Sequence, residues 1–229
     1  MAEVKAADFF TLPPSLAAFA AFFSPEVPPW EWLKRIGPAL ATFRFDARTR
    51  ALPPGVHTEG PVWIHPEAKV PSYATIIGPV YIGARSELRP GVFIRGNLIA
   101  GEGCVIGHNA EIKNVLMMDR VEAPHRPYIG DSILGNKSHL GAGVVCSNLR
   151  LDNREVLVRV GTELVSTGLR KFGAILGDEA QVGCNAVLNP GTLLGPRALV
   201  MPAIAFGGYL PAGHIGRVRY TVVAEPRRD

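Results

Sequence analysis

The chain has 229 residues, of which 47% are apolar and 19% charged, with a formal net charge of +4. A disordered chain would have lower hydrophobicity and a higher net charge. Three cysteines make no disulfide framework, and no signal pattern or membrane-length apolar stretch is recognisable, so a cytoplasmic protein without a membrane partner is predicted. The 24 basic and 20 acidic residues are mixed along the chain, which gives no nucleic-acid footprint.

Residues 1–58 lie outside any repeat. They contain three proline pairs, a Phe/Ala-rich stretch and the cluster of Trp30 and Trp32. This composition predicts short helices around 15–23 and 29–42 that form an N-terminal cap or arm. We expect the arm to pack across the open first coil of the domain that follows, either as a cover for unpaired strand edges or as a partner-binding arm.

From Ile64 to Met118 an apolar residue recurs at every sixth position, and a second column of mostly small or branched residues follows four places later. A helical repeat would need spacings near 3.6 and few glycines. A hexapeptide repeat instead predicts a parallel β-helix, here over 59–210, in which three rungs close one coil. Residues 18 apart then stack in one column along the coil axis. The predicted fold class is therefore all-β.

The six-residue phase breaks twice. Residues 119–127 exceed the phase by four residues, and we expect a loop there, with the interior column resuming at Tyr128. Residues 149–172 form a longer insertion in which alternating valines precede a Gly-Thr turn, a pattern that predicts a hairpin. A basic tail occupies 211–229. Loops that project from a rigid scaffold often carry function.

One loop histidine and two stacked cations form the candidate site. His125 lies in the expected loop between two prolines, and Tyr128 follows three residues later. Arg95 and Lys113 are 18 residues apart, so we expect them to stack with like charges adjacent, an arrangement that a bound anion would offset. Together these residues predict a basic groove suited to a phosphorylated substrate; the plainer alternative for His125 is an exposed loop side chain.

The remaining histidines and cysteines give no metal site. No two of the six histidines are closer than eight positions, and catalytic zinc needs three convergent ligands, so a carbonic anhydrase-like zinc centre is not supported. Cys104 and Cys146 fall on interior columns and should be buried, whereas Cys184 falls on a turn. No metal is predicted.

Four longer motifs run through the repeat: IGHNAEIKN (106–114), APHRPYIGDSILGNKSHLGAG (123–143), STGLRKFGAILGD (166–178) and VGCNAVLNPG (182–191). The motifs from 94 to 150 resemble the acetyltransferase domain of the bifunctional glucosamine-1-phosphate acetyltransferase/N-acetylglucosamine-1-phosphate uridylyltransferase. The stretch 166–191 is more similar to archaeal-type sugar-1-phosphate nucleotidylyltransferases that carry this domain. The resemblance covers about 60–210 and implies a left-handed β-helix.

The resemblance also implies roles. His125 corresponds to the general base that takes a proton from a sugar amine as it attacks the thioester of acetyl-CoA. Glu111 either orients that amine or is a solvated turn residue. The substrate contacts implied are Arg95, Lys113, Tyr128 and Asn148. The positions that match the acetyl-CoA groove are Ala142, Cys184 and Pro202, with Arg217 near the CoA phosphates.

Two departures qualify the match. The family tyrosine after the substrate asparagine is Leu149 here, and the family lysine a few residues on has no clear counterpart. Residues 1–60 also contain nothing like a nucleotidylyltransferase domain. The predicted function is therefore an acetyl-CoA-dependent N-acetyltransferase on a hexosamine 1-phosphate or related sugar nucleotide. We expect a homotrimer, with a nucleotidylyltransferase as a separate partner. The alternative is a non-catalytic sugar-nucleotide-binding or partner-binding protein.

Overall fold

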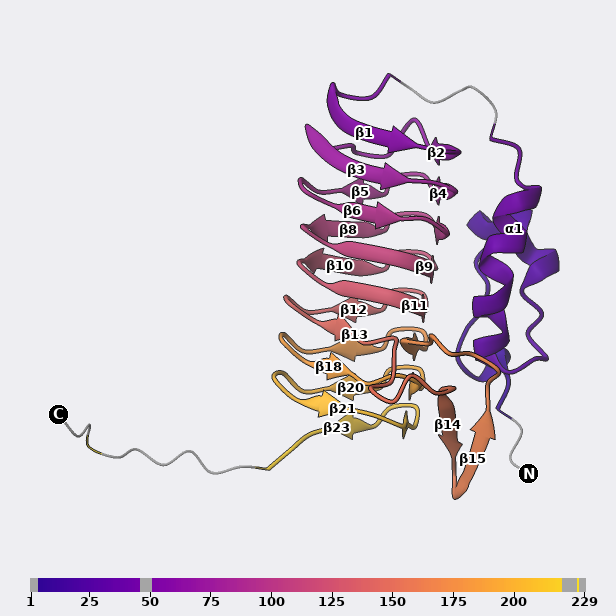
Figure 1. The fold of residues 1–229 in the computed structure, drawn as a ribbon, viewed down its shortest axis with the longest axis vertical. Coiled ribbons are helices and arrows are strands. Elements are labelled where there is room, and N and C mark those ends of the chain that lie inside the picture. Colours follow the sequence, from indigo (N-terminus) through magenta and orange to yellow (C-terminus); the bar gives the residue numbers. More distant parts are fainter. Residues whose placement is uncertain (1–3, 46–50, 220–225, 227–229) are drawn as a thin grey trace.

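The protein is a left-handed parallel β-helix, as predicted, in a computed structural model that describes residues 4–45, 51–219 and 226. Its coils stack into a prism with three walls, and an N-terminal arm lies along one side (Figure 1). Each strand of the coils pairs in parallel with the strand one coil away, so the interior apolar columns form a continuous core along the prism.

We call the three walls A, B and C. Wall A consists of β1 (Gly55–Glu59), β3 (Tyr73–Ile77), β6 (Phe93–Arg95), the first half of β9 (Glu111–Met117), the first half of β11 (Tyr128–Leu134), β13 (Val145–Cys146), β18 (Val187–Leu188) and β21 (Ala205–Phe206). Wall B consists of β2 (Val62–Ile64), β4 (Val80–Ile82), β7 (Leu98–Ala100), the second halves of β9 and β11, β16 (Ala174–Leu176), β19 (Thr192–Leu194) and β22 (Tyr209–Leu210). Wall C consists of β5 (Glu87–Leu88), β8 (Val105–His108), β10 (Glu122–His125), β12 (His139–Leu140), β17 (Gln181–Val182), β20 (Leu199–Val200) and β23 (Ile215–Gly216).

The prediction of a projecting loop at 119–127 is wrong. Strand β10 lies there and pairs with β8 and β12, so His125 belongs to wall C and its edge rather than to a projecting loop. The interior residue at the resumption is Ile129, which is fully buried, whereas the expected Tyr128 faces outward. Met117 likewise takes the interior position expected for Met118.

The physical reason is a pair of shortened rungs. Interior side chains follow one another at spacings of 5, 6, 6, 5, 6 and 6 residues, through Ile112, Met117, Ala123, Ile129, Leu134, Leu140 and Cys146. Each short rung turns from wall A to wall B through a single residue with a positive φ, Asn114 (55°) or Asp131 (45°). One coil earlier the same turn uses both Gly96 and Asn97. The phase shift therefore comes from two missing residues, not from four added ones.

The N-terminal arm packs along wall B, not across the open first coil. Its elements are η1 (Ala6–Asp8), η2 (Pro14–Phe22), η3 (Pro29–Arg35) and α1 (Ile36–Thr42), with η3 and α1 against β7, β9 and β11. The arm packs on wall B because the outer surface of this wall carries a column of apolar side chains, and burying them away from water is favourable. That column is Ile99, Leu116, Ile133, Ile175 and Leu193, and all five are buried.

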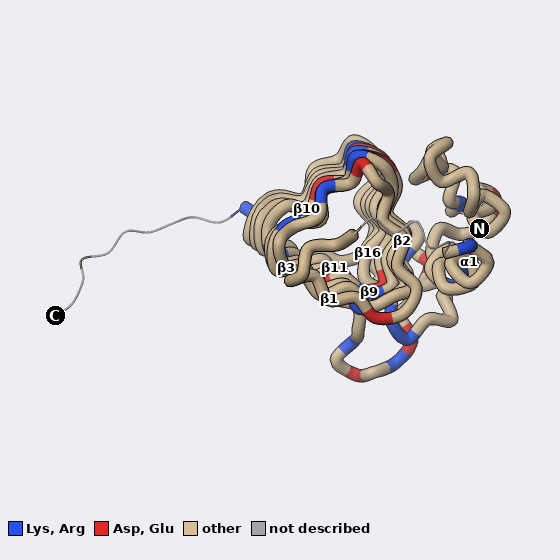
Figure 2. The backbone as a smooth tube through the Cα atoms, turned by 90° about the horizontal axis from the view of Figure 1, so that it is seen from above, with Lys and Arg blue, Asp and Glu red and all other residues tan. Residues whose placement is uncertain are grey.

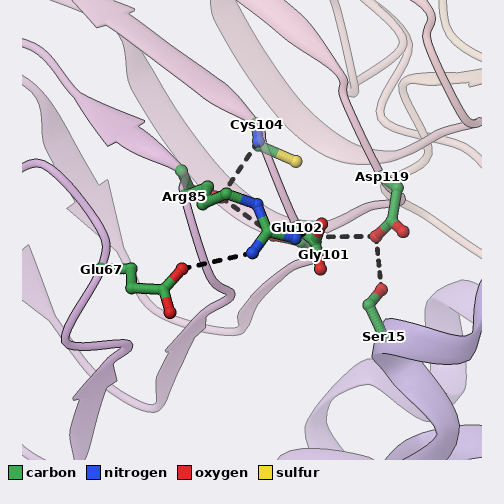
Figure 3. A network of polar contacts seen from close by, with 8 residues as sticks. Ser15, Glu67, Arg85, Gly101, Glu102, Cys104 and Asp119 are labelled. Carbon is green, nitrogen blue, oxygen red and sulfur yellow. Dashed lines mark hydrogen bonds and ion pairs between the residues drawn. The ribbon is translucent and has the colours of Figure 1, made fainter.

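Two carboxylates on the edge between walls B and C fasten the arm. Asp119 accepts a hydrogen bond from the Ser15 hydroxyl, and its Oδ1 also accepts from the backbone N–H of Glu102 at 2.8 Å (Figure 3). Asp178 Oδ2 accepts from the backbone N–H of Thr11 at 3.1 Å. No helix among the described residues has the length and apolar character of a membrane span.

The insertion contains the predicted hairpin. Strands β14 (Leu157–Val160) and β15 (Glu163–Ser166) pair antiparallel, and the alternating valines pack into the apolar layer shared by the arm and wall B. The predicted burial of the cysteines is also confirmed: Cys104 and Cys146 are buried and Cys184 is exposed. Burial raises the pKa of both interior thiols to about 12.

Candidate functional site

The predicted site residues gather on wall A and on the two edges that border it. We call the edge between walls C and A the His125 corner, with His108, His125, Ala142, Cys184 and Pro202. The edge between walls A and B is the Asp131 corner, with Asn97, Asn114, Asp131 and Asn148.

The His125 corner is a ladder of main-chain hydrogen bonds. The N–H of Arg126 donates to the carbonyl of His108 at 2.8 Å, and the N–H of Gly143 donates to the carbonyl of His125 at 2.9 Å. The ladder continues from Asn185 to the Ala142 carbonyl and from Ala203 to the Cys184 carbonyl, at 2.8 and 2.9 Å. The backbone of His125 is therefore fixed, while its side chain is exposed.

The residues matched to the cofactor groove lie in one line on this corner. Ala142, Cys184 and Pro202 follow His125 one coil at a time, as the ladder and the strand register require. At the lower end, a surface pocket is lined by Pro202, Arg217 and Arg219 with their neighbours. The structure thus brings all four predicted cofactor residues onto one edge that begins at His125.

The Asp131 corner is a network of side chains. Asp131 is only 4% exposed, and a buried carboxylate needs charged or hydrogen-bonding partners. Lys113 Nζ lies 3.0 Å from its Oδ1 and 3.3 Å from its Oδ2. The Nδ2 groups of Asn114 and Asn148 donate to Oδ1 and Oδ2 at 2.9 and 2.5 Å. This network fixes two predicted substrate contacts, Lys113 and Asn148.

Wall A connects the two corners. The Tyr128 hydroxyl donates to Oδ1 of Asn148 at 3.4 Å, which joins the residue after the His125 turn to the Asp131 network. Burial raises the pKa of Tyr128, and the negative charges of Glu111 and Asp131 raise it further, so this phenol stays a neutral donor. One coil earlier, Arg95 forms an ion pair with Glu111 at 2.6 Å.

Arg95 and Lys113 stack one coil apart as predicted, but their charges do not call for a bound anion. The two residues occupy neighbouring places in the register, but each has its own carboxylate, Glu111 for Arg95 and Asp131 for Lys113. No bound anion is needed to offset their repulsion. Glu111 is accordingly a partner of Arg95 rather than a purely solvated turn residue.

Two residues at the site escaped sequence reasoning. Asp131 was visible as the aspartate of the YIGD motif, and it occupies a turn position that is asparagine in the two preceding coils. Lys171 could not be seen, because 21 intervening residues separate it from Leu149 in sequence. The insertion returns to the coil at this point, so Lys171 pairs with Leu149 in an antiparallel bridge. A lysine therefore lies beside Asn148 after all.

Fold and site together define a hexapeptide-repeat β-helix protein with a histidine edge and a charged edge on one wall. A sequence profile of the GMPPB C-terminal domain matches residues 76–203, more than half of the chain, and the chain belongs to this family. The predicted resemblance is confirmed by its relatives.

Three relatives illustrate the match. The bifunctional sugar-1-phosphate nucleotidylyltransferase/acetyltransferase of Sulfurisphaera tokodaii is 34% identical, over 76% of this chain and 43% of its own length. The bifunctional protein GlmU of Methanococcus vannielii is 35% identical, over 48% of this chain and 27% of its own length. The putative uncharacterized acetyltransferase YaiX of Escherichia coli K12 is 33% identical over 68% of each chain. The chain thus spans less than half the length of the two bifunctional relatives.

Proposed function

We propose that the protein is an acetyl-CoA-dependent N-acetyltransferase acting on an amino sugar with an anomeric phosphate, either a hexosamine 1-phosphate or a sugar nucleotide. The observation that carries the proposal is the arrangement of wall A. An exposed histidine and the line of cofactor-matched residues border it on one side, and a fixed polar network borders it on the other.

The reaction is direct acyl transfer. The sugar amine attacks the thioester carbonyl, a C–N bond forms, and the C–S bond breaks to release CoA as a thiol. The amine proton must leave during this step, and we assign its acceptance to the imidazole of His125 at the edge of wall A, since histidine is the side chain that most often serves as a general base. A fixed backbone with an exposed side chain suits this role, because the base keeps its position while it exchanges protons with solvent.

The Asp131 corner would hold the sugar and its phosphate. Lys113 and Lys171 supply cations, while Tyr128 and Asn148 supply neutral hydrogen-bonding groups. Asp131 is a positioning residue: it holds the Lys113 ammonium and the Asn148 amide in one orientation before substrate arrives. Such fixed geometry reduces the entropy that binding must otherwise spend on ordering the side chains.

Acetyl-CoA would lie along the His125 corner, where it supplies the activated acetyl group. Ala142, Cys184 and Pro202 are small or short side chains one coil apart, an arrangement that suits an extended ligand lying along the edge. Arg217 and Arg219, at the lower end of this line, would receive anionic groups of CoA.

We further propose a homotrimer whose active grooves lie between neighbouring prisms. The arm already covers wall B, so a neighbouring subunit would contact the His125 corner and the walls beside it. Light scattering at micromolar concentration tests this arrangement. A mass three times that of the chain is expected, and a monomer would contradict it.

A thiol-release assay tests the activity. The full chain is mixed with acetyl-CoA and a panel of hexosamine 1-phosphates and nucleotide-linked amino sugars, and free CoA thiol is measured together with the acetylated sugar. Release that depends on one amino sugar supports the proposal. Binding of sugar nucleotides without any acetyl transfer would support the second candidate, a non-catalytic binding protein, which the half-buried Leu149 in the place of the family tyrosine favours.

A further inference from the structure

The insertion 149–172 carries more positive charge than its neighbours neutralise. It contains five basic and three acidic residues, a net charge of +2. Arg150 is occupied by Asp152 through two contacts, at 2.9 and 2.6 Å, and this pairing holds the pKa of Asp152 well below its usual range. Glu155 accepts hydrogen bonds from Ser166 and Gly168 instead of pairing with a cation of the insertion.

Three cations are left at the base of the insertion. Among the described residues, no carboxylate lies within ion-pair distance of Arg154, Arg170 or Lys171. All three side chains are exposed. On wall A, by contrast, both cations, Arg95 and Lys113, are paired with carboxylates. Near the Asp131 corner, free positive charge is therefore concentrated on the insertion.

The base of the insertion is attached directly to the Asp131 corner. The N–H of Phe172 donates to the carbonyl of Asn148 at 2.9 Å, and Lys171 is bridged to Leu149. Arg170 comes next along the chain, and its guanidinium lies 3.5 Å from the amide oxygen of Asn153, beside Arg154. A path of cations thus leads outward from the sugar-binding network. Figure 2 shows Lys and Arg, interspersed with acidic residues, on the loop that projects beside β9.

We propose that Arg154 and Arg170 bind the second phosphate of a diphosphate-linked amino sugar. This inference rests on the proposed function and narrows its substrate class from a sugar monophosphate to a sugar diphosphate. The first phosphate lies next to Lys171 and Lys113, and the second lies one group farther out, where the two guanidinium groups are. Planar guanidinium groups bind phosphate oxygens in pairs, which a single lysine cannot do.

Equilibrium binding of the full chain tests the proposal without requiring turnover. The probes are inorganic phosphate, inorganic pyrophosphate, uridine diphosphate and farnesyl diphosphate, measured by calorimetry near physiological ionic strength. We expect the diphosphates to bind at least about tenfold more tightly than phosphate. The double variant Arg154→Ala/Arg170→Ala should lose that difference. Arg159→Ala is the matched control, because Arg159 lies on β14 opposite Leu164, away from the base, and it should keep the difference.

Equal binding of phosphate and pyrophosphate by the parent protein would overturn the proposal. So would a double variant that keeps the preference, or a control that loses it equally. Thermal unfolding of each variant shows whether it is folded; all three side chains are exposed, so no change is expected. The relative affinities of the uridine and farnesyl compounds distinguish a nucleotide-linked from a lipid-linked sugar. If the diphosphate preference holds while no amino sugar releases CoA thiol, the acetyltransferase proposal fails and this binding site remains.

Discussion

The two corners that border wall A are built in opposite ways. At the His125 corner the main chain is held by one hydrogen bond per coil, and the exposed side chains are left to solvent. At the Asp131 corner the turn is one residue shorter, and the side chains are fixed to one another around a buried carboxylate. One corner fixes the backbone and the other fixes the functional groups.

This difference matches the two tasks that acyl transfer sets. A general base must gain and lose a proton in every cycle, so it benefits from contact with solvent. A binding site for a charged sugar phosphate benefits from groups that are already oriented. If the comparison is right, substitutions at the His125 corner change the rate without changing stability, and substitutions at the Asp131 corner change both stability and binding.

The largest effect is expected for His125→Ala. Removing a positioned general base should lower turnover by roughly 10²- to 10⁴-fold. The thermal midpoint should shift little, because the exposed imidazole is replaced while the His125 carbonyl still accepts from Gly143. The assay is CoA thiol release at saturating substrate, alongside thermal unfolding.

His108→Ala is the matched control for that variant. His108 is the neighbour of His125 in the strand register, it is exposed, and its Nδ1 lies 2.9 Å from the carbonyl oxygen of Pro90. We expect it to keep turnover within a few-fold of the parent. Equal losses in the two variants would mean that the corner tolerates no change, and His125 would lose its assignment.

Next in size is Asp131→Ala, which should impair folding and binding together. Removing one partner of a buried pair typically costs about 3–5 kcal/mol. Here the cost should fall toward the lower end, because Lys113 is 30% exposed and can be hydrated. Chemical denaturation measures the loss. Asp131→Asn keeps the shape and part of the hydrogen bonding, so it should recover some stability while the apparent KM for the amino sugar stays raised. Unchanged stability in both variants would contradict the network described here.

The β-helix itself was predictable because the interior columns are long. Ten consecutive apolar residues at a spacing of six leave no other regular structure, and the burial of Cys104 and Cys146 followed from the same columns. The hairpin was predictable for a different reason, the alternating valines before a Gly-Thr turn. The position of the arm did not follow. The outer column of wall B that attracts it, which includes Ile99 and Leu116, is a second periodicity hidden among the inward residues.

The sequence predicted which residues form the candidate site, but not how they are positioned and paired. Residue spacing assigned the phase break to a loop, because a count along the chain cannot distinguish four added residues from two missing ones. The pairing of Arg95 with Glu111 and of Lys113 with Asp131 depends on side-chain directions across coils, which a column count does not give. Lys171 depends on where a long insertion returns, a fact of tertiary structure alone.

Lys113→Ala should give a smaller effect that still separates the corners. A charge-assisted contact to the sugar phosphate is worth about 1.5–3 kcal/mol, so affinity for the amino sugar phosphate should fall by roughly ten- to 150-fold. Acetyl-CoA binding should be nearly intact, since the cofactor line lies on the other corner. Calorimetry with each ligand separately makes the measurement.

Lys137→Ala is a suitable control for this variant. Lys137 is an exposed lysine on the edge between walls B and C, and it pairs with Glu179 at 3.5 Å. Comparable loss of acetyl-CoA affinity in Lys113→Ala would show that the corners are not separate.

The smallest effect is expected in the chemical labelling of the three cysteines, which tests directly whether acetyl-CoA lies along the His125 corner. Cys104 and Cys146 have their pKa raised to about 12 by burial, so at pH 8 both stay protonated and shielded, whereas Cys184 is exposed on the His125 corner. A maleimide should therefore modify one thiol per chain in the native protein and three after denaturation, as read by intact mass.

Saturating acetyl-CoA should slow the native modification several-fold, because the ligand would cover Cys184. Cys184→Ser should abolish native labelling while reducing acetyl transfer by no more than a few-fold, since no chemical step uses the thiol. Native labelling of all three thiols would contradict the packed core, and a labelling rate indifferent to acetyl-CoA would place the cofactor elsewhere than on this corner.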